Sequence, residues 1–153
     1  MALYTIGDLH LSLGSKKPMD IFGDRWQNYV EKIRLGFSAL TEDDTTVLCG
    51  DLSWGMSLEE SLLDFRFIHA LPGRKIILKG NHDYWWTTKA KMERFIAENG
   101  FDSIHILFNN HYDYGEEYAI CGTRGWVYMA GEKHDDKIQA REAGRLELSI
   151  KSA

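Results

Sequence analysis

The sequence predicts an α/β fold with a parallel sheet, and three observations support this prediction. Short apolar runs at Leu3–Ile6, Thr45–Cys49 and Lys75–Leu78 have the length of buried strands, and a glycine follows each run directly or after one residue. Helical periodicity fills the stretches between these runs, which is the alternation typical of parallel strands joined by helical crossovers. The length of 153 residues suits one domain with a sizeable core.

The first strand ends at Gly7, and a polar loop from Gly14 to Gly23 follows it. Asp24 can cap a helix that runs to about Leu40, because apolar residues recur there at helical spacing. These apolar residues are Trp26, Tyr29, Val30, Ile33 and Phe37.

Two further helices are predicted between and after the next two strands. Ser57 caps a helix from Leu58 to His69, with Glu60 at the capping-box position and Pro72-Gly73 beyond its end. Thr87 or Thr88 starts a helix that reaches Asn99-Gly100.

Shorter strands and one long helix are predicted in the remainder of the chain. The strands are Ser103–Phe108, Tyr118–Cys121 and Trp126–Tyr128, and the helix runs from about Asp135 to the last residue. No glycine cap and no further element follow this helix. We therefore expect residues 1–153 to be the N-terminal part of a longer domain.

Composition excludes several classes of protein. The net charge is −5 and acidic and basic residues are interspersed, so no surface for duplex nucleic acid is predicted. No segment has the length of a membrane span and no leader is recognised, which favours a cytoplasmic protein. Cys49 and Cys121 each end an apolar run, and we expect two buried, reduced thiols.

Metal-binding residue types follow each of the three main strands. The segments are Gly7-Asp8-Leu9-His10, Gly50-Asp51 and Gly80-Asn81-His82-Asp83. The carboxyl ends of parallel strands meet at one sheet edge, so these residues should converge. Asp8 and His10 are two apart, so an extended segment would project both to one side. Taken singly, each segment is more typical of a turn, and an ordinary α/β domain stays an alternative.

These motifs resemble the calcineurin-like metallophosphoesterases, a resemblance that covers essentially the whole chain. The order Asp-x-His, Gly-Asp, Gly-Asn-His-Asp carries it, and Lys17-Pro18-Met19-Asp20, Trp54 and the run from Asn81 to Trp86 resemble a bacterial subgroup. The resemblance implies an α-β-β-α sandwich of two mixed sheets. It also implies hydrolysis of a phosphomonoester or phosphodiester by water that two divalent ions activate, commonly manganese, iron or zinc.

The resemblance also assigns roles to individual residues. Asp8 and His10 would hold one metal, Asp51 would bridge both metals, and Asn81 would bind the second. His82 would act on the phosphoryl group or the leaving oxygen without binding metal, and Asp83 would hydrogen-bond His82 to orient it.

The sequence departs from the family after this point. The family pattern continues with a later lone histidine and a Gly-His-x-His motif, and neither is found here. His105 is predicted to be a half-exposed strand residue, His111 a turn residue and His134 a solvated one. The second metal would then keep two protein ligands, so the chain by itself could be a non-catalytic metal-binding or scaffolding module. Missing strands would leave an open sheet edge, which predicts a homo-oligomer.

Aromatic residues near the motifs allow two interpretations. Trp54 follows Gly50-Asp51, and Tyr84-Trp85-Trp86 follow His82. They could line a pocket that stacks on a nucleobase, or they could pack in the wall and core, which is the commoner use of large aromatics.

Overall fold

The computed structural model describes residues 1–125 and 135–153. These residues form two compact units, Met1–Ile106 and Leu107–Ala153. The predicted strand Trp126–Tyr128 and the predicted solvated His134 lie outside the described residues.

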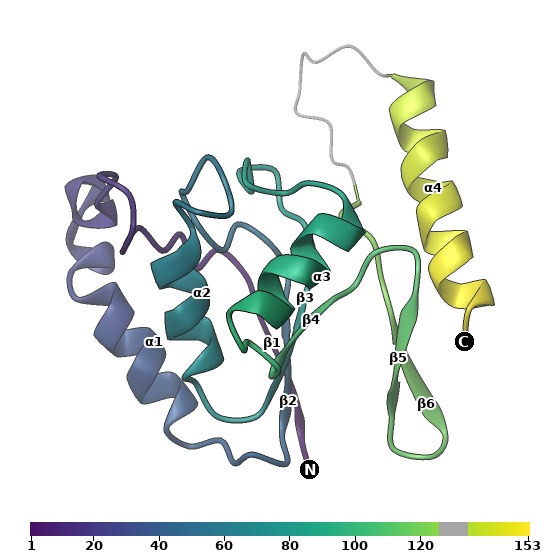
Figure 1. The fold of residues 1–153 in the computed structure, drawn as a ribbon, viewed down its shortest axis with the longest axis horizontal. Coiled ribbons are helices and arrows are strands. Elements are labelled where there is room, and N and C mark those ends of the chain that lie inside the picture. The colour runs from purple at the N-terminus through teal and green to yellow at the C-terminus, as the bar shows by residue number, and fades with distance from the viewer. Residues whose placement is uncertain (126–134) are drawn as a thin grey trace. The chain divides into compact units, whose positions relative to one another are not determined.

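The first unit is built on a four-stranded parallel sheet (Figure 1). Its strands are β1 (Leu3–Ile6), β2 (Thr45–Leu48), β3 (Arg74–Ile77) and β4 (Ile104–Ile106), in the spatial order β1-β2-β3-β4. Leu3 pairs with Thr45, and Thr45 pairs with Arg74, so the first three strands end at the same level. This arrangement confirms the predicted α/β fold and aligns the loops that follow the strands.

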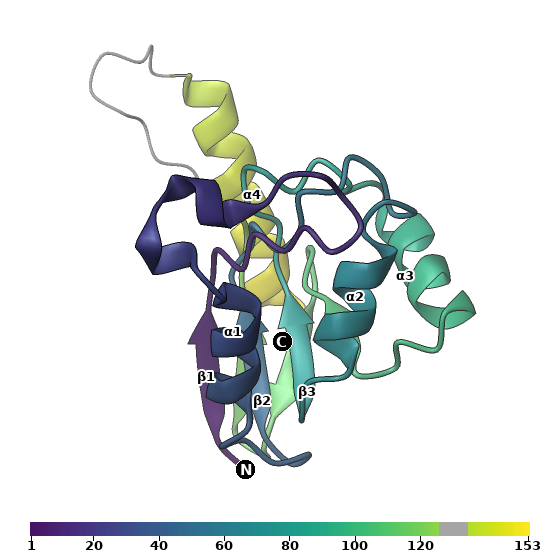
Figure 2. The ribbon, with the colours of Figure 1, turned by 90° about the vertical axis from the view of Figure 1, so that its left-hand side faces the viewer.

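Three helices accompany the sheet: α1 (Tyr29–Phe37), α2 (Leu62–His69) and α3 (Lys89–Glu98). Helices α1 and α2 cover the same face of the strands (Figure 2). Phe65 of α2 lies at the centre of an aromatic core and contacts Trp85, Phe95 and Phe101. Leu48, Ile76 and Ile77 from the strands are fully buried beneath this layer.

Two helices begin later than predicted. Residues after Pro18 form short 3-10 turns at Met19–Phe22 and Asp24–Trp26, and Asn28 has a φ of 55°, which an α-helix cannot contain. Helix α1 therefore begins at Tyr29 rather than after Asp24. Ser57 Oγ accepts the Glu60 N–H as predicted, but residues 58–61 form turns before α2 begins.

The second unit contains a hairpin and a long helix. Strands β5 (His111–Tyr114) and β6 (Tyr118–Cys121) are antiparallel, and α4 (Asp136–Lys151) confirms the predicted final helix. Ser149 of α4 donates a hydrogen bond to the Asn110 carbonyl and accepts one from the Gly122 N–H. His111 was predicted in a turn, but it begins β5, because it pairs with Cys121 of β6 in the hairpin. His105 is a half-buried strand residue, as predicted.

Both cysteines are free thiols, as predicted. Neither is buried, which contradicts the prediction. Strand β2 ends at Leu48, and Cys49 is the first residue beyond it, with an exposed side chain. Cys121 is half-buried at the end of β6. Among the described helices, none combines the length and the hydropathy that crossing a membrane requires.

Lys75 is a fully buried cation at the start of β3, and it makes stability depend on pH. Its Nζ donates to the carbonyls of Leu71 and Gly73 at 2.5 and 2.6 Å. Burial lowers the pKa of Lys75 to about 8. In the unfolded chain the ammonium keeps its proton to about pH 10.5. Between these values the unfolded state binds more protons, so the free energy of unfolding should rise with pH.

This dependence predicts a specific effect of Lys75→Met. Urea unfolding at several pH values between 8 and 10.5 should show a rise in stability for the unchanged chain that the variant lacks. Lys91→Met, at an exposed position on α3, is the matched control and should retain the rise. Parallel pH profiles for the unchanged chain and Lys75→Met would contradict the assignment.

Candidate metal centre

The loops after β1 and β2 stay side by side beyond the ends of the strands. The N–H groups of Asp8, His10 and Leu11 donate to the carbonyls of Gly50, Asp51 and Leu52 at 3.0, 2.9 and 2.9 Å. Leu11 and Ser53 then form an isolated parallel bridge. This ladder fixes the two loops in register and brings the first two sequence motifs together.

The backbone is left-handed at three of the predicted site residues. Asp8, His10 and Asp51 have φ values of 55°, 44° and 53°. The sequence predicted an extended segment from Asp8 to His10, and this prediction is wrong. Non-glycine residues in this region cost of order 1 kcal/mol each and gather at functional sites, where the surrounding structure enforces them.

Side chains from all three loops meet at one place. His10 Nε2 lies 3.4 Å from Asp8 Oδ1 and 3.9 Å from Asp51 Oδ2. His82 Nδ1 lies 2.8 Å from Asp51 Oδ2. The ligand atoms of His10, Asp51 and His82 are all within 4.8 Å of one another, a spacing that one metal ion could bridge. The carboxylates of Asp8 and Asp51 thus face the same imidazole nitrogen.

Asp51 is the central residue of this cluster, and its side chain is 7% exposed. Burial by itself would raise the pKa of the Asp51 carboxyl. The backbone N–H of His82, bonded to Oδ1 at 2.8 Å, and the two nearby imidazoles outweigh this, so the pKa lies below its usual value. Asp51 therefore presents an ionised carboxylate, which is the form that binds metal.

The glycines that precede the motifs allow the loops to approach closely. A Cβ on Gly50, whose φ is 100°, would lie 2.4 Å from the Gly80 nitrogen. A Cβ on Gly80 would lie 2.0 Å from Asp51 Oδ1 and 2.2 Å from the Asp51 nitrogen. The predicted close backbone approach is therefore present, and it is what seats Asp51 against the loop after β3.

Gly80→Ala is expected to disturb this contact strongly. The added methyl group overlaps backbone as well as the Asp51 carboxylate, so the two loops must separate, at a cost of about 3 kcal/mol in the free energy of unfolding. Urea unfolding and metal affinity measured by calorimetry should both fall. Gly36→Ala, at a glycine that like Gly80 lacks a positive φ and whose added Cβ meets no atom within 4 Å, controls for the methyl group itself. Equal losses in the two variants would contradict the steric argument.

Asp83 differs from its predicted role. Its carboxylate is fully buried and accepts the N–H groups of Asp51, Leu52 and Gly80 at 2.7–2.8 Å, and the Trp85 Nε1–H at 3.0 Å. Burial raises the pKa of Asp83, and these backbone donors oppose the rise. The predicted hydrogen bond to the His82 ring is absent from the described residues. Asp83 instead ties the loop after β2 to the loop after β3.

His82 and Asn81 occupy the open side of the cluster. The His82 ring bonds to Asp51 rather than to Asp83, and it joins the candidate ligands although the resemblance implied a role beside the metals. Asn81 is exposed, and its Nδ2 lies 2.9 Å from His82 Nδ1. Asn81 therefore borders the cluster through His82.

The aromatic residues divide between the two interpretations. Trp54 stacks on His10 with ring centroids 5.0 Å apart, and it lies 5.1 Å from the His82 ring, so it is a wall of the site. Tyr84 is 51% exposed beside His82. Trp85 is buried in the core.

Sequence reasoning missed two residues that support the site. Asp64 of α2 is fully buried, and it accepts the Leu13 N–H at 2.7 Å and the Ser53 hydroxyl at 2.5 Å, so it anchors both loops. The Tyr29 hydroxyl donates to the His10 carbonyl at 3.1 Å. The only signal for Asp64 was a charge within the apolar run Leu62–His69.

A family model and solved structures match this chain. A crystal structure of a protein of unknown function from Aquifex aeolicus is similar, with 22% sequence identity and a TM-score of 0.49, over 99% of this chain and 74% of that one. A search of curated proteins gives no match. The family model of calcineurin-like phosphoesterases matches residues 1–148. The chain therefore belongs to the calcineurin-like phosphoesterase family.

Proposed function

We propose that this protein hydrolyses a phosphate ester, either a monoester or a diester, with two divalent ions of manganese, iron or zinc. The convergence of His10, Asp51 and His82 within 4.8 Å carries the proposal, together with membership of the family. Three distant loops are held together there by backbone hydrogen bonds and by Asp83, at the cost of left-handed backbone. An ordinary turn would not need this arrangement.

The donor set fits divalent ions. Imidazole nitrogens and carboxylate oxygens bind manganese, iron and zinc, and the Asp51 carboxylate is ionised. Asp8 and His10 would hold one ion, Asp51 would contribute to the binding of both, and Asn81 would contribute to the second. Bound ions would supply an activated water and positive charge that offsets the phosphate oxygens.

His82 is proposed to act on the leaving group. The contact between Nδ1 and Asp51 orients the ring, and Nε2, which lies 3.2 Å from the Asn81 amide nitrogen, would hold the proton that the leaving oxygen needs. The ring is 38% exposed, so a substrate can reach it. Asp83 is proposed to act indirectly, because it accepts the Asp51 N–H and so fixes the position of Asp51.

The test is hydrolysis of p-nitrophenyl phosphate and of bis(p-nitrophenyl) phosphate by the protein before and after removal of metal. We expect chelation to abolish turnover and manganese to restore it. Turnover that is insensitive to chelation would overturn the proposal. Metal binding without turnover of either ester would favour the alternative, a non-catalytic metal-binding or scaffolding module.

The two proposed metal positions differ in the number of protein ligands that these residues offer. Asp8, His10 and Asp51 offer three protein ligands to one ion, whereas the second has Asp51 and Asn81, so we propose one tight and one weak ion from these residues. We further propose that residues 1–153 form the N-terminal part of the domain and that other segments supply the remaining ligands. Metal analysis after dialysis should find about one ion per chain.

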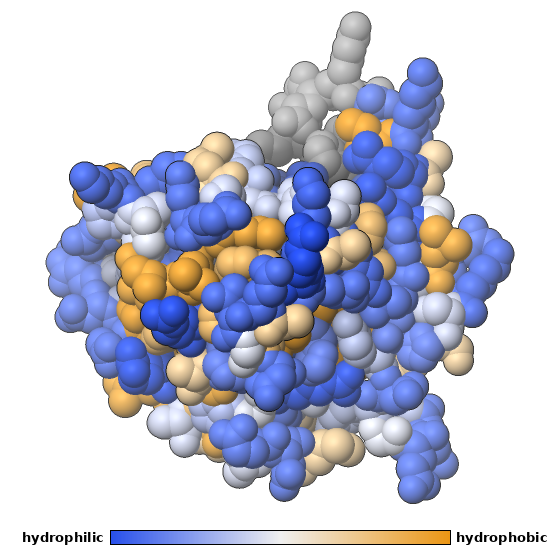
Figure 3. Space-filling view, in the orientation of Figure 1, coloured by the Kyte–Doolittle hydropathy of each residue, from blue (hydrophilic) through white to orange (hydrophobic). Residues whose placement is uncertain are grey.

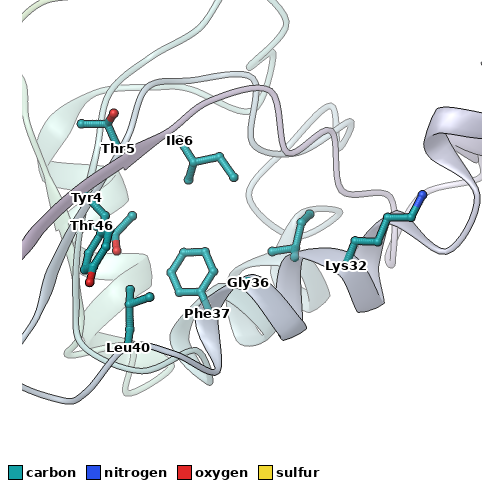
Figure 4. Close-up of a pocket in the computed structure, with 9 residues that line it drawn as sticks. Tyr4, Thr5, Ile6, Lys32, Gly36, Phe37, Leu40 and Thr46 are labelled. Carbon is teal, nitrogen blue, oxygen red and sulfur yellow. The ribbon is translucent and has the colours of Figure 1, made fainter.

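The edge of the sheet supports a proposed homo-oligomer. Within the described residues no strand pairs with the outer side of β1, and Leu3, Tyr4 and Ile6 of this strand are exposed. A cavity of about 350 Å³ lies between β1 and α1, lined by Ile6, Phe37 and Leu40 among others (Figure 4). Hydrophobic residues also gather on the surface over α1 and α2 (Figure 3). Sedimentation of the protein and of Tyr4→Lys would test for association.

A cytoplasmic location stays a prediction. Fractionation of cells that produce the protein would test it.

A further inference from the structure

A second pocket opens directly beside the candidate metal centre. It has a volume of about 370 Å³ and lies between the start of the loop after β1 and the N-terminal part of α1, with the 3-10 turn Asp24–Trp26 at its rim. This volume is within the range of pockets that hold small molecules. Asp8, which lies 3.4 Å from His10, lines the pocket and thus borders both the pocket and the metal cluster.

Two positive charges line this pocket without a carboxylate partner. Arg25 and Lys32 are both exposed, and in the part of the chain that the structure describes neither forms an ion pair. Lys32 Nζ donates to the Arg25 carbonyl at 3.1 Å, which brings the two residues to the same side of the pocket. In Figure 4 the Lys32 side chain extends away from Phe37 and Leu40 along α1. The one acidic residue that lines the pocket is Asp8, a proposed metal ligand.

The other walls are largely apolar and adjoin the cluster. Ile6, Leu9 and Ile33 line the pocket, together with the aromatic side chains of Trp26 and Tyr29. The Trp26 ring meets the His10 ring edge-on at 5.7 Å. A ligand in this pocket would therefore lie against Asp8, a proposed metal ligand, and against the two cations.

We propose that this pocket receives the part of the substrate that extends from the scissile phosphate, and that this part carries a second anionic group. The inference rests on the proposed function. Arg25 and Lys32 would bind a carboxylate or a further phosphate, because unpaired cations beside apolar walls stabilise an anion on an apolar body. In a chain with a net charge of −5, such a local pair of cations would select doubly anionic esters. The substrate class is thus a phosphate ester of an alcohol with an apolar body and an additional acid.

The experiment compares two substrates that differ by one anion. The manganese-loaded protein would be assayed with phenyl phosphate and with 4-carboxyphenyl phosphate, for the unchanged chain and for the double variant Arg25→Gln/Lys32→Gln. The control Lys91→Gln/Arg94→Gln removes two cations from α3, away from this pocket. We expect the first double variant to lower kcat/KM for the carboxylated ester about tenfold, with phenyl phosphate and the control changed less than about twofold.

Binding of a non-hydrolysable probe separates the two proposals. The affinity for 4-carboxyphenyl phosphonate, measured by calorimetry, should fall about tenfold in Arg25→Gln/Lys32→Gln, whereas the affinity for phenyl phosphonate should not change. This result would support the pocket assignment even if neither ester were hydrolysed. A lack of hydrolysis would then overturn the proposed function and not the pocket assignment. Equal losses for both probes, no loss for either, or the same loss in the control would overturn the pocket assignment.

Discussion

Asp51→Asn is expected to lower kcat/KM for phosphate ester hydrolysis about 1000-fold and to leave the fold intact. Asparagine has the same shape and tolerates the left-handed φ of 53°, so the backbone cost should not change. The substitution removes the negative charge on which His10 and His82 converge and one oxygen that a metal could bind. Losing electrostatic groups at a reacting centre typically costs 100- to 1000-fold in rate, and loss of metal adds to this.

Steady-state kinetics, metal analysis and urea unfolding would be measured on the same preparations. We expect Asp51→Asn to bind less than one ion per chain and to unfold at nearly the urea concentration of the unchanged protein. Asp102→Asn, which neutralises a side chain that is 93% exposed and outside the cluster, should match the unchanged protein in all three measurements. Full activity of Asp51→Asn would remove Asp51 from the mechanism.

The sheet and the convergence of the loops were predictable because their signals are local. Each apolar run is long enough for one buried strand, and the parallel alternation then places every strand end at one edge. Asp8, Asp51 and His82 met at that edge as predicted, since topology alone brings them there. Gly50 and Gly80 were also predictable, because a close backbone approach leaves no room for a side chain.

Other features depend on contacts that spacing does not encode. The late start of α1 follows from the left-handed Asn28, which helical periodicity does not reveal. The role of Asp83 was not predictable either, because its four donors come from residues 51, 52, 80 and 85, which meet only in the folded chain. The same holds for Asp64, whose partners Leu13 and Ser53 belong to loops after two different strands.

Asp83→Asn is expected to lower the free energy of unfolding by about 4 kcal/mol, although it changes one atom and exposes nothing. Oδ2 accepts the N–H groups of Asp51 and Gly80, and Oδ1 accepts those of Leu52 and Trp85. In either orientation, the amide NH₂ faces two buried N–H donors, and each buried donor left without an acceptor costs about 1–3 kcal/mol. Urea unfolding measures this loss.

Asp43→Asn provides the matched control, because Asp43 is exposed and lies outside the loops of the site. It should leave stability, metal affinity and activity unchanged. Asp83→Asn should also weaken metal binding, because the loop that carries Asp51 loses the acceptor of either the Asp51 or the Leu52 N–H. Metal affinity would be measured without urea, at a temperature at which the variant is still folded. A variant with normal metal affinity and reduced stability would limit Asp83 to a structural role. Unchanged stability would mean that the four donors find other acceptors, which the burial of Asp51, Leu52 and Trp85 around Asp83 opposes.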